Sequence, residues 1–120
     1  MRKYFIILVS LLSTFSNANI VEKGKQQDKH CREIMAMAMA VMMSRQNGLS
    51  LANALINVDR MVNEKEITEN KGFILREILR DAYQEPKFSS ESYKQDKIDE
   101  FSSKYYLACR EGMDFMDVNE

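Results

Sequence analysis

The chain contains only two cysteines, Cys31 and Cys109, and they stand 78 positions apart. A single disulfide is therefore the only bond that they can form within the chain, and it would join a point near its start to a point near its end. In a chain-entropy model, a loop of this length makes the bond worth about 4 to 5 kcal/mol of stability. Whether the bond forms depends on the compartment in which the chain folds.

The first eighteen residues have the three-part pattern of a secretory signal peptide. Residues 2 and 3 are basic, residues 4–12 form an apolar run, and residues 16–18 are a small-residue cleavage site. The apolar run is shorter than the roughly 20 residues that a membrane-spanning helix needs. We therefore expect cleavage after residue 18, export to the periplasm or medium, and no stable membrane insertion afterwards. In that oxidising environment the two cysteines are expected to pair.

Residues 19–120 would remain after cleavage, which is enough for a single domain with a modest core. This mature chain has 15 basic and 18 acidic residues, and its net charge is −3. It has no run of basic residues free of acidic neighbours. We therefore expect no nucleic-acid partner and no attraction to an anionic membrane surface.

The spacing of apolar residues and the positions of helix-ending residues predict two helices in the first half of the mature chain. The first covers about residues 28–46, after a polar leader, and ends at Asn47-Gly48. The second follows Ser50, which is a suitable N-cap, and continues to about residue 63. Its predicted apolar face consists of Leu51, Leu55, Val58 and Val62.

Two more helices are predicted in the second half. The third carries the clearest apolar stripe, which consists of Phe73, Ile74, Ile78, Leu79, Ala82 and Tyr83. It must stop before Pro86, which cannot continue a helix. Ser89 and Ser90 offer N-caps for the fourth helix, and Gly112 is expected to end it.

These elements predict an all-α fold, because no segment alternates between apolar and polar residues as a strand does. We expect a small bundle or array of about four helices, closed by one disulfide. Cys31 lies near the start of the first helix and Cys109 near the end of the fourth. A bond between them would make these two helices antiparallel.

The segment 35–43 holds five of the nine methionines and suggests three kinds of role. Thioether sulfurs bind Cu(I), so Met35, Met39 and Met42, with His30 nearby, form an alternative soft-metal site. Flexible methionines also fill cores beside small alanines, and this is the interpretation that we favour. A Met-rich surface that binds a partner is a third possible role. We expect no cofactor.

The chain lacks the patterns of known catalytic sites. His30 is its only histidine, and a neighbouring cysteine in a disulfide is no nucleophile. There is no nucleophile-elbow sequence and no glycine-rich phosphate loop. Acidic residues are numerous, but nothing in their spacing singles out a pair for acid–base chemistry. We therefore expect a protein that is not an enzyme.

Binding to another periplasmic protein is the function that we expect instead. Tyrosine and arginine are enriched at the centres of protein interfaces, and Arg45, Tyr106 and Arg110 are the candidate partner-binding residues. Tyr105, four residues before Cys109, is expected to share the face of the disulfide, whereas Tyr106 points about 100° away. An inhibitor or immunity-type protein and a small chaperone-like factor both fit this description.

Several short motifs in the mature chain resemble one group of proteins. They are Cys31, the Ala/Met-rich helix ending in Ser44-Arg45-Gln46-Asn47-Gly48, Ala82-Tyr83 before Pro86, and Phe101, Tyr106 and Cys109. With these motifs the chain resembles short exported proteins of Gram-negative bacteria and their phages. The resemblance implies a periplasmic location, and it supplies no activity and no catalytic residue.

Overall fold

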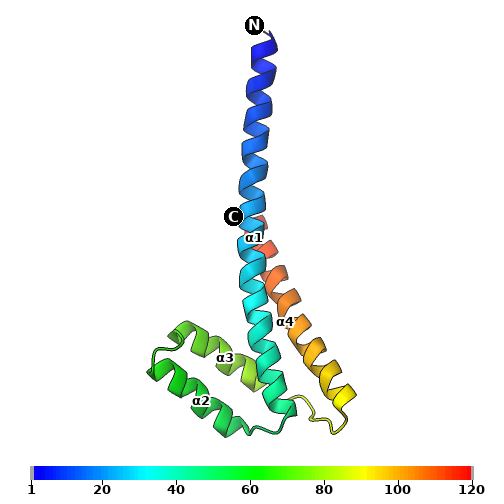
Figure 1. Cartoon of the computed structure of the whole chain (residues 1–120). Coiled ribbons are helices and arrows are strands. Elements are labelled where there is room, and N and C mark those ends of the chain that lie inside the picture. Colours follow the sequence, from blue (N-terminus) through cyan, green and yellow to red (C-terminus); the bar gives the residue numbers. More distant parts are fainter. Residues whose placement is uncertain (1, 120) are drawn as a thin grey trace.

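The computed structural model describes the backbone of residues 2–119 and the side chains of residues 20–112. Four helices and no strand occur in that part of the chain. They are α1 (Arg2–Gln46), α2 (Leu51–Asn63), α3 (Glu69–Ala82) and α4 (Glu91–Asn119). In Figure 1, α1 and α4 lie side by side in opposite directions, and α2 and α3 form a hairpin beside the C-terminal part of α1. The predicted all-α fold of four helices is confirmed.

The end of α1 and the start of α2 lie where the sequence predicts them. Gly48 has a φ of 91°, a conformation that glycine adopts without strain. Its N–H donates to the backbone oxygen of Arg45, and the N–H of Leu49 donates to that of Ser44. These bonds satisfy the last carbonyls of α1. Ser50 caps α2, because its hydroxyl accepts the N–H of Asn53 at 3.1 Å.

Two helix boundaries differ from those expected. α1 begins at Arg2 rather than near residue 28, so residues 19–27 are helical. That segment lacks proline, and its Lys, Glu and Gln residues favour a helix. α4 continues to Asn119, and the prediction that Gly112 ends it is therefore wrong. A glycine inside a helix costs about 1 kcal/mol, which its helix-forming neighbours can offset.

The expected signal peptide covers residues 1–18, whose side chains lie outside the described residues. Its cleavage and the export of the protein therefore stay predictions. In the part of the chain that the structure describes, no helix is both long enough and apolar enough to span a membrane.

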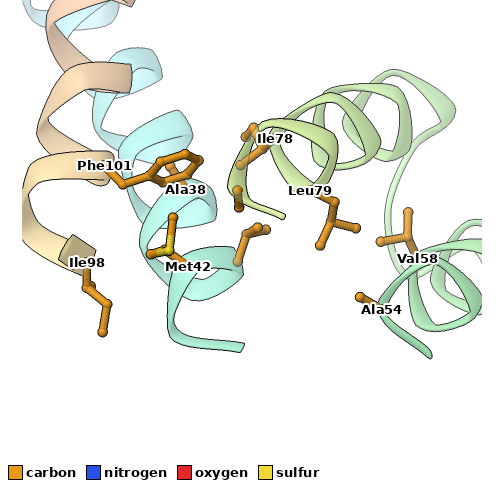
Figure 2. Close-up of a cluster of buried hydrophobic side chains, with 10 residues drawn as sticks. Ala38, Met42, Ala54, Val58, Ile78, Leu79, Ile98 and Phe101 are labelled. Atoms are coloured by element: carbon orange, nitrogen blue, oxygen red, sulfur yellow. The ribbon is translucent and has the colours of Figure 1, made fainter. Parts of the chain in front are cut away.

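All four helices contribute to the core (Figure 2). Its buried members are Ala38, Val41, Met42, Ala54, Val58, Ile78, Leu79, Ala82, Ile98 and Phe101. The apolar stripe predicted for the third helix is confirmed except at Phe73, which is 64% exposed. Phe73 lies five positions before Ile78, so the two side chains leave the helix on opposite faces. Leu51, expected on the inner face of the second helix, is also exposed.

α3 has the central place in the packing. α1 packs most extensively on α4, and α3 packs on α1 and on α2, whereas α2 makes no substantial contact with α1. Figure 2 shows Leu79 of α3 facing Ala54 and Val58 of α2. α2 is therefore held to the rest of the protein through α3, and a groove stays open between α1 and α2.

Gly72 allows α2 and α3 to approach closely. A Cβ atom at residue 72 would lie 2.5 Å from the Cγ2 atom of Val62 on α2, well inside normal contact distance. We therefore expect Gly72→Ala to lower the free energy of unfolding by about 1 to 3 kcal/mol, the usual range for overpacking. Urea denaturation followed by circular dichroism measures the change.

Two further sets of variants test whether a steric clash causes this loss of stability. Val62→Ala should cost less stability in the Gly72→Ala background than in the wild type, because it removes the clashing methyl group. Gly24 is a helical glycine with no neighbouring atom within 4 Å of the position of a Cβ. Gly24→Ala should therefore raise stability by about 0.5 to 1 kcal/mol. Equal losses from Gly24→Ala and Gly72→Ala would contradict the steric explanation.

Candidate functional site

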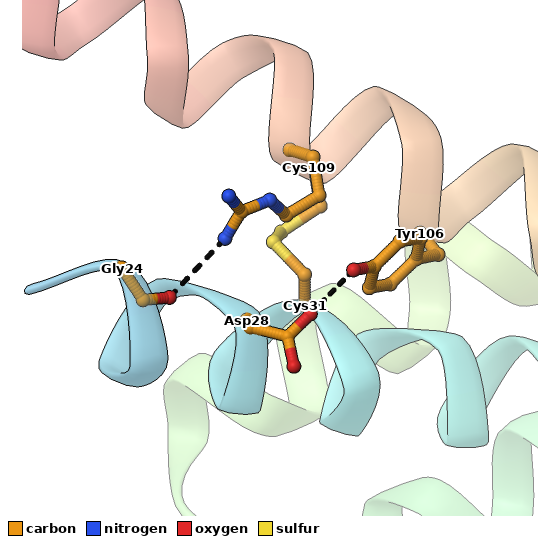
Figure 3. The surroundings of a disulfide bond; sticks show 6 residues. Gly24, Asp28, Cys31, Tyr106 and Cys109 are labelled. Atoms are coloured by element: carbon orange, nitrogen blue, oxygen red, sulfur yellow. Dashed lines mark hydrogen bonds between the residues drawn. A yellow bond between two sulfur atoms is a disulfide. The ribbon is translucent and has the colours of Figure 1, made fainter. Parts of the chain in front are cut away.

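The disulfide joins α1 to α4. Cys31 and Cys109 are bonded, with their Cα atoms 5.5 Å apart, and this confirms the predicted bond and the antiparallel direction of the two helices. Figure 3 shows the bond between the facing sides of these helices. Cys31 is completely buried, so α1 and α4 shield its sulfur from solvent.

Tyr106 and Arg110, two of the predicted partner-binding residues, make contacts within the protein around this disulfide. The hydroxyl of Tyr106 donates a hydrogen bond to Asp28, and Arg110 donates one to the backbone oxygen of Gly24 at 3.4 Å (Figure 3). The Tyr106 bond, followed by the ion pair with Arg32, lowers the pKa of Asp28. These polar groups help to hold α4 on α1, and a role in binding a partner stays a prediction.

The two adjacent tyrosines point differently from what was expected. Tyr106, three residues before Cys109, lies on the side of α4 that faces α1 and the disulfide. Tyr105 contacts α3 instead, where its hydroxyl donates to Asp81 at 2.8 Å. Burial raises the pKa of Tyr105, and the bond to Asp81 raises it further. Positions three and four apart lie almost equally close on a helix, so the sequence alone did not distinguish them.

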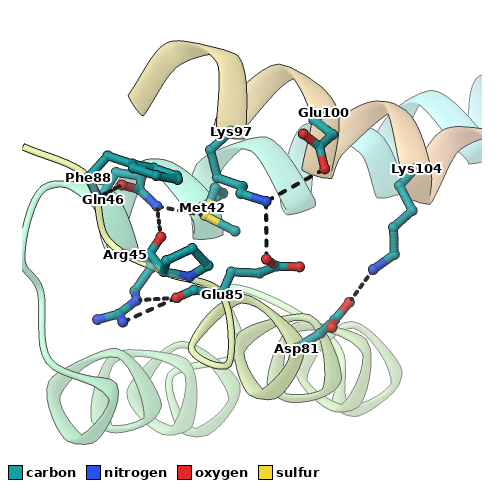
Figure 4. Close-up of polar contacts among 10 residues, drawn as sticks. Met42, Arg45, Gln46, Asp81, Glu85, Phe88, Lys97, Glu100 and Lys104 are labelled. Carbon is teal, nitrogen blue, oxygen red and sulfur yellow. Dashed lines mark hydrogen bonds and ion pairs between the residues drawn. The ribbon is translucent and has the colours of Figure 1, made fainter. Parts of the chain in front are cut away.

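Arg45, the third predicted partner-binding residue, lies at the other end of the protein. It follows Cys31 by fourteen residues, which is about 21 Å along a helix axis. Its guanidinium lies 5.1 Å from the centre of the Tyr83 ring and donates to the backbone oxygen of Glu85 (Figure 4). Arg45, Tyr106 and Arg110 therefore do not form one surface.

A buried glutamine holds the connection between α3 and α4. Gln46 has no solvent exposure, and its Nε2 donates to the backbone oxygen of Pro86 at 2.9 Å. Its Oε1 accepts the backbone N–H of Phe88, also at 2.9 Å (Figure 4). Beside it, Lys97 of α4 pairs with Glu85 at 3.1 Å, and this bond is the main cause that raises the pKa of Lys97. No pattern in the sequence indicates these contacts.

The methionines of α1 divide between the interior and the surface. Met42 is completely buried and Met37 packs against the core, as expected for methionines that fill space beside alanines. Met39 and Met43 are 38% and 45% exposed. Met42 is thus enclosed, whereas Met39, another member of the alternative copper site, faces solvent. His30 is exposed as well. Binding of Cu(I) stays a prediction.

The open space between α1 and α2 is an apolar groove of about 330 Å³. It is lined by Ala40, Val41, Ser44, Leu49, Ala54, Asn57, Val58, Arg60, Met61, Leu75 and Leu79. We call this set the apolar groove. A second hollow shares Ala40, Ser44 and Leu49 with it and continues over Met43, Asn47 and Gly48. We call this extension the turn hollow. Together they form one continuous surface at the C-terminal end of α1.

The apolar groove and the turn hollow differ in chemical character from a hollow elsewhere on the described part of the chain. A larger hollow of about 620 Å³ lies at the α2–α3 turn, and charged and polar residues make up most of its lining. The apolar groove instead has mostly aliphatic walls from three helices. Its small volume is at the lower end for ligand pockets, which suits a few side chains of a peptide.

Comparison of the sequence with family models, with curated proteins and with solved structures gives no match. Among residues 20–112, no three His, Cys, Asp or Glu side chains lie close enough together to hold a metal ion. The candidate functional site is therefore defined by the geometry of this chain alone: an apolar groove extended by the turn hollow.

Proposed function

We propose that this protein acts outside the cytoplasm by binding another protein, without catalysing a reaction, and that the apolar groove is the binding surface. The observation that supports this proposal is the groove itself. Its walls come from α1, α2 and α3, and its residues are mostly apolar. Surfaces of this kind accept the apolar side chains of a partner helix or segment.

The side chains around the groove fit such a role. Met61 lines the groove and Met43 lines the turn hollow, and methionine adapts its shape to different contacts. Ala40 lies where the two meet, and its small side chain lets a partner backbone come close to α1. Of the two exposed methionines in the segment predicted as a possible binding surface, Met39 and Met43, Met43 thus lines this surface.

The pattern of residues 1–18 and the disulfide support export to the periplasm. A disulfide between distant cysteines is typical of proteins that fold in an oxidising compartment. Intact mass of protein purified from periplasm tests this part directly. Loss of a mass matching residues 1–18, with no free thiols, supports export, whereas a full-length mass with two free thiols contradicts it.

Capture with three matched baits tests the function. Ala40 is exposed and lines the groove, so Ala40→Glu should abolish binding without harming the core. Ala36 is exposed one helical turn earlier and lines neither hollow, so Ala36→Glu should bind as the wild type does. Mass spectrometry of co-purified proteins measures the difference. If capture is equal with all three baits, the groove is not the binding surface.

The same capture distinguishes the two kinds of binding protein. One partner in a stable one-to-one complex indicates an inhibitor or immunity-type protein. Weak binding to many unfolded proteins indicates a chaperone-like factor. The absence of both would contradict a protein-binding function.

A further inference from the structure

The charge at one end of the groove points to the chemistry of the partner. The turn hollow ends at Gly48, and the Nζ atom of Lys87 lies 3.2 Å from the position of a Cβ there. The ammonium group of Lys87 therefore lies at the edge of this hollow. Lys87 makes no ion pair within residues 20–112, and its side chain is exposed.

Arg45 adds a second positive charge at this end. Its guanidinium is held by the backbone oxygen of Glu85 and by the ring of Tyr83, not by a carboxylate. Two positive charges thus lie near the last turn of α1, and neither is paired with an acidic side chain of residues 20–112. They stand out in a chain whose mature form carries a net charge of −3.

Arg60, the cation that lines the apolar groove, is paired with acidic side chains. Arg60 pairs with Glu64 at 2.8 Å and with Glu66 at 3.4 Å. Its charge is therefore balanced within the protein. The two charges without a partner carboxylate among residues 20–112 lie at the end formed by the α1–α2 turn, and most of the residues that line the groove are apolar.

We propose that the partner segment is an amphipathic helix with acidic residues at one end, its apolar side chains filling the groove and its carboxylates facing Lys87 and Arg45. This inference rests on the proposed function, because it assigns a chemistry to the segment bound there. Complementary charges at the edge of an apolar contact fix the direction in which a helix binds and select against other partners.

Two synthetic peptides test the charge preference. Each is a fluorescein-labelled helical peptide with leucines at positions i, i+4, i+7 and i+11, and its first turn carries either two glutamates or two lysines. We expect the acidic peptide to bind about tenfold more tightly at low salt, with a smaller difference at high salt. Fluorescence anisotropy measures both affinities on the full mature protein.

Matched variants test which residues cause the preference for the acidic peptide. Lys87→Glu should remove the preference for the acidic peptide, whereas Lys29→Glu, an equal charge change on the exposed side of α1, should leave it unchanged. Ala40→Glu should weaken both peptides, and Ala36→Glu neither. Circular dichroism of each variant shows that the helices persist.

The outcomes separate this inference from the proposed function. Equal affinity for both peptides, lost in Ala40→Glu, would overturn the acidic preference and leave the groove as a binding surface. Failure of both peptides, together with capture that Ala40→Glu does not change, would overturn both. A concentration-dependent dimer of the protein alone that Ala40→Glu dissociates would make a second copy the occupant and overturn the inference.

Discussion

Replacing both cysteines, by Cys31→Ala and Cys109→Ala together, is expected to lower the free energy of unfolding by about 2 to 5 kcal/mol. The bond closes a loop of 78 residue steps, so its loss releases much conformational freedom in the unfolded chain. It also removes a covalent link between α1 and α4, whose remaining contacts there include the partly buried hydrogen bond from Tyr106 to Asp28. Urea denaturation of purified mature protein measures the difference.

Reductant provides the control for the disulfide prediction. Dithiothreitol should destabilise the wild type by a similar amount and leave the double variant unchanged. At about 4 to 8 °C for each kcal/mol in a domain of this size, the melting temperature should fall by at least about 8 °C. An unchanged melting temperature in the double variant would show that the bond contributes nothing to stability.

Gln46→Leu is expected to lower the free energy of unfolding by about 2 to 4 kcal/mol. Leucine has a similar volume, but it leaves the backbone oxygen of Pro86 and the backbone N–H of Phe88 without their partners. Both hydrogen bonds are partly buried, and a polar group left unpaired inside a protein costs about 1 to 3 kcal/mol. Thermal and urea denaturation give the size of the effect.

Hydrogen exchange shows whether this glutamine acts through the connection between α3 and α4. The amide of Phe88 should exchange slowly in the wild type and rapidly in Gln46→Leu. Gln26→Leu changes the same residue type on the exposed part of α1 and should alter stability by no more than about 0.5 kcal/mol. If both variants lose the same small amount of stability, the buried network is not the cause.

Local sequence signals predicted the elements of this fold well. Gly48, Ser50 and Pro86 act over one or two turns of chain, and each lies at or just beyond a helix boundary as expected. The two cysteines predicted the antiparallel pair, because a covalent bond fixes which helix ends meet. Gly112 failed as a helix end because one glycine weakens a helix only slightly when no proline follows.

The arrangement of the helices depends on contacts that no local pattern contains. Phe73 begins an apolar stripe, and this pattern predicts that it is buried. Which part of the stripe is buried depends on how α3 packs between α1 and α2. Gln46 is polar and gave no signal of burial. Its partners lie 40 and 42 positions away in the sequence.

The candidate site was missed for the same reason. The apolar groove exists because α2 packs on α3 without packing substantially on α1. Gly72 allows the close approach of α2 to α3. The sequence did hold a partial signal, since Ala40 and Met43 lie in the Ala/Met-rich segment that was recognised as unusual. Only the fold shows that these residues border an open groove.

Site-specific crosslinking tests the proposed function most directly. A photoreactive benzoylphenylalanine is placed at residue 40, on the groove, or at residue 36, one turn away on the same helix, and the cells that produce the protein are irradiated. Binding in the groove predicts covalent adducts from position 40 and none from position 36, with one defined adduct for an inhibitor and many for a chaperone-like factor. Adducts from position 36 alone, or from neither position, would contradict the assignment of the groove as the binding surface.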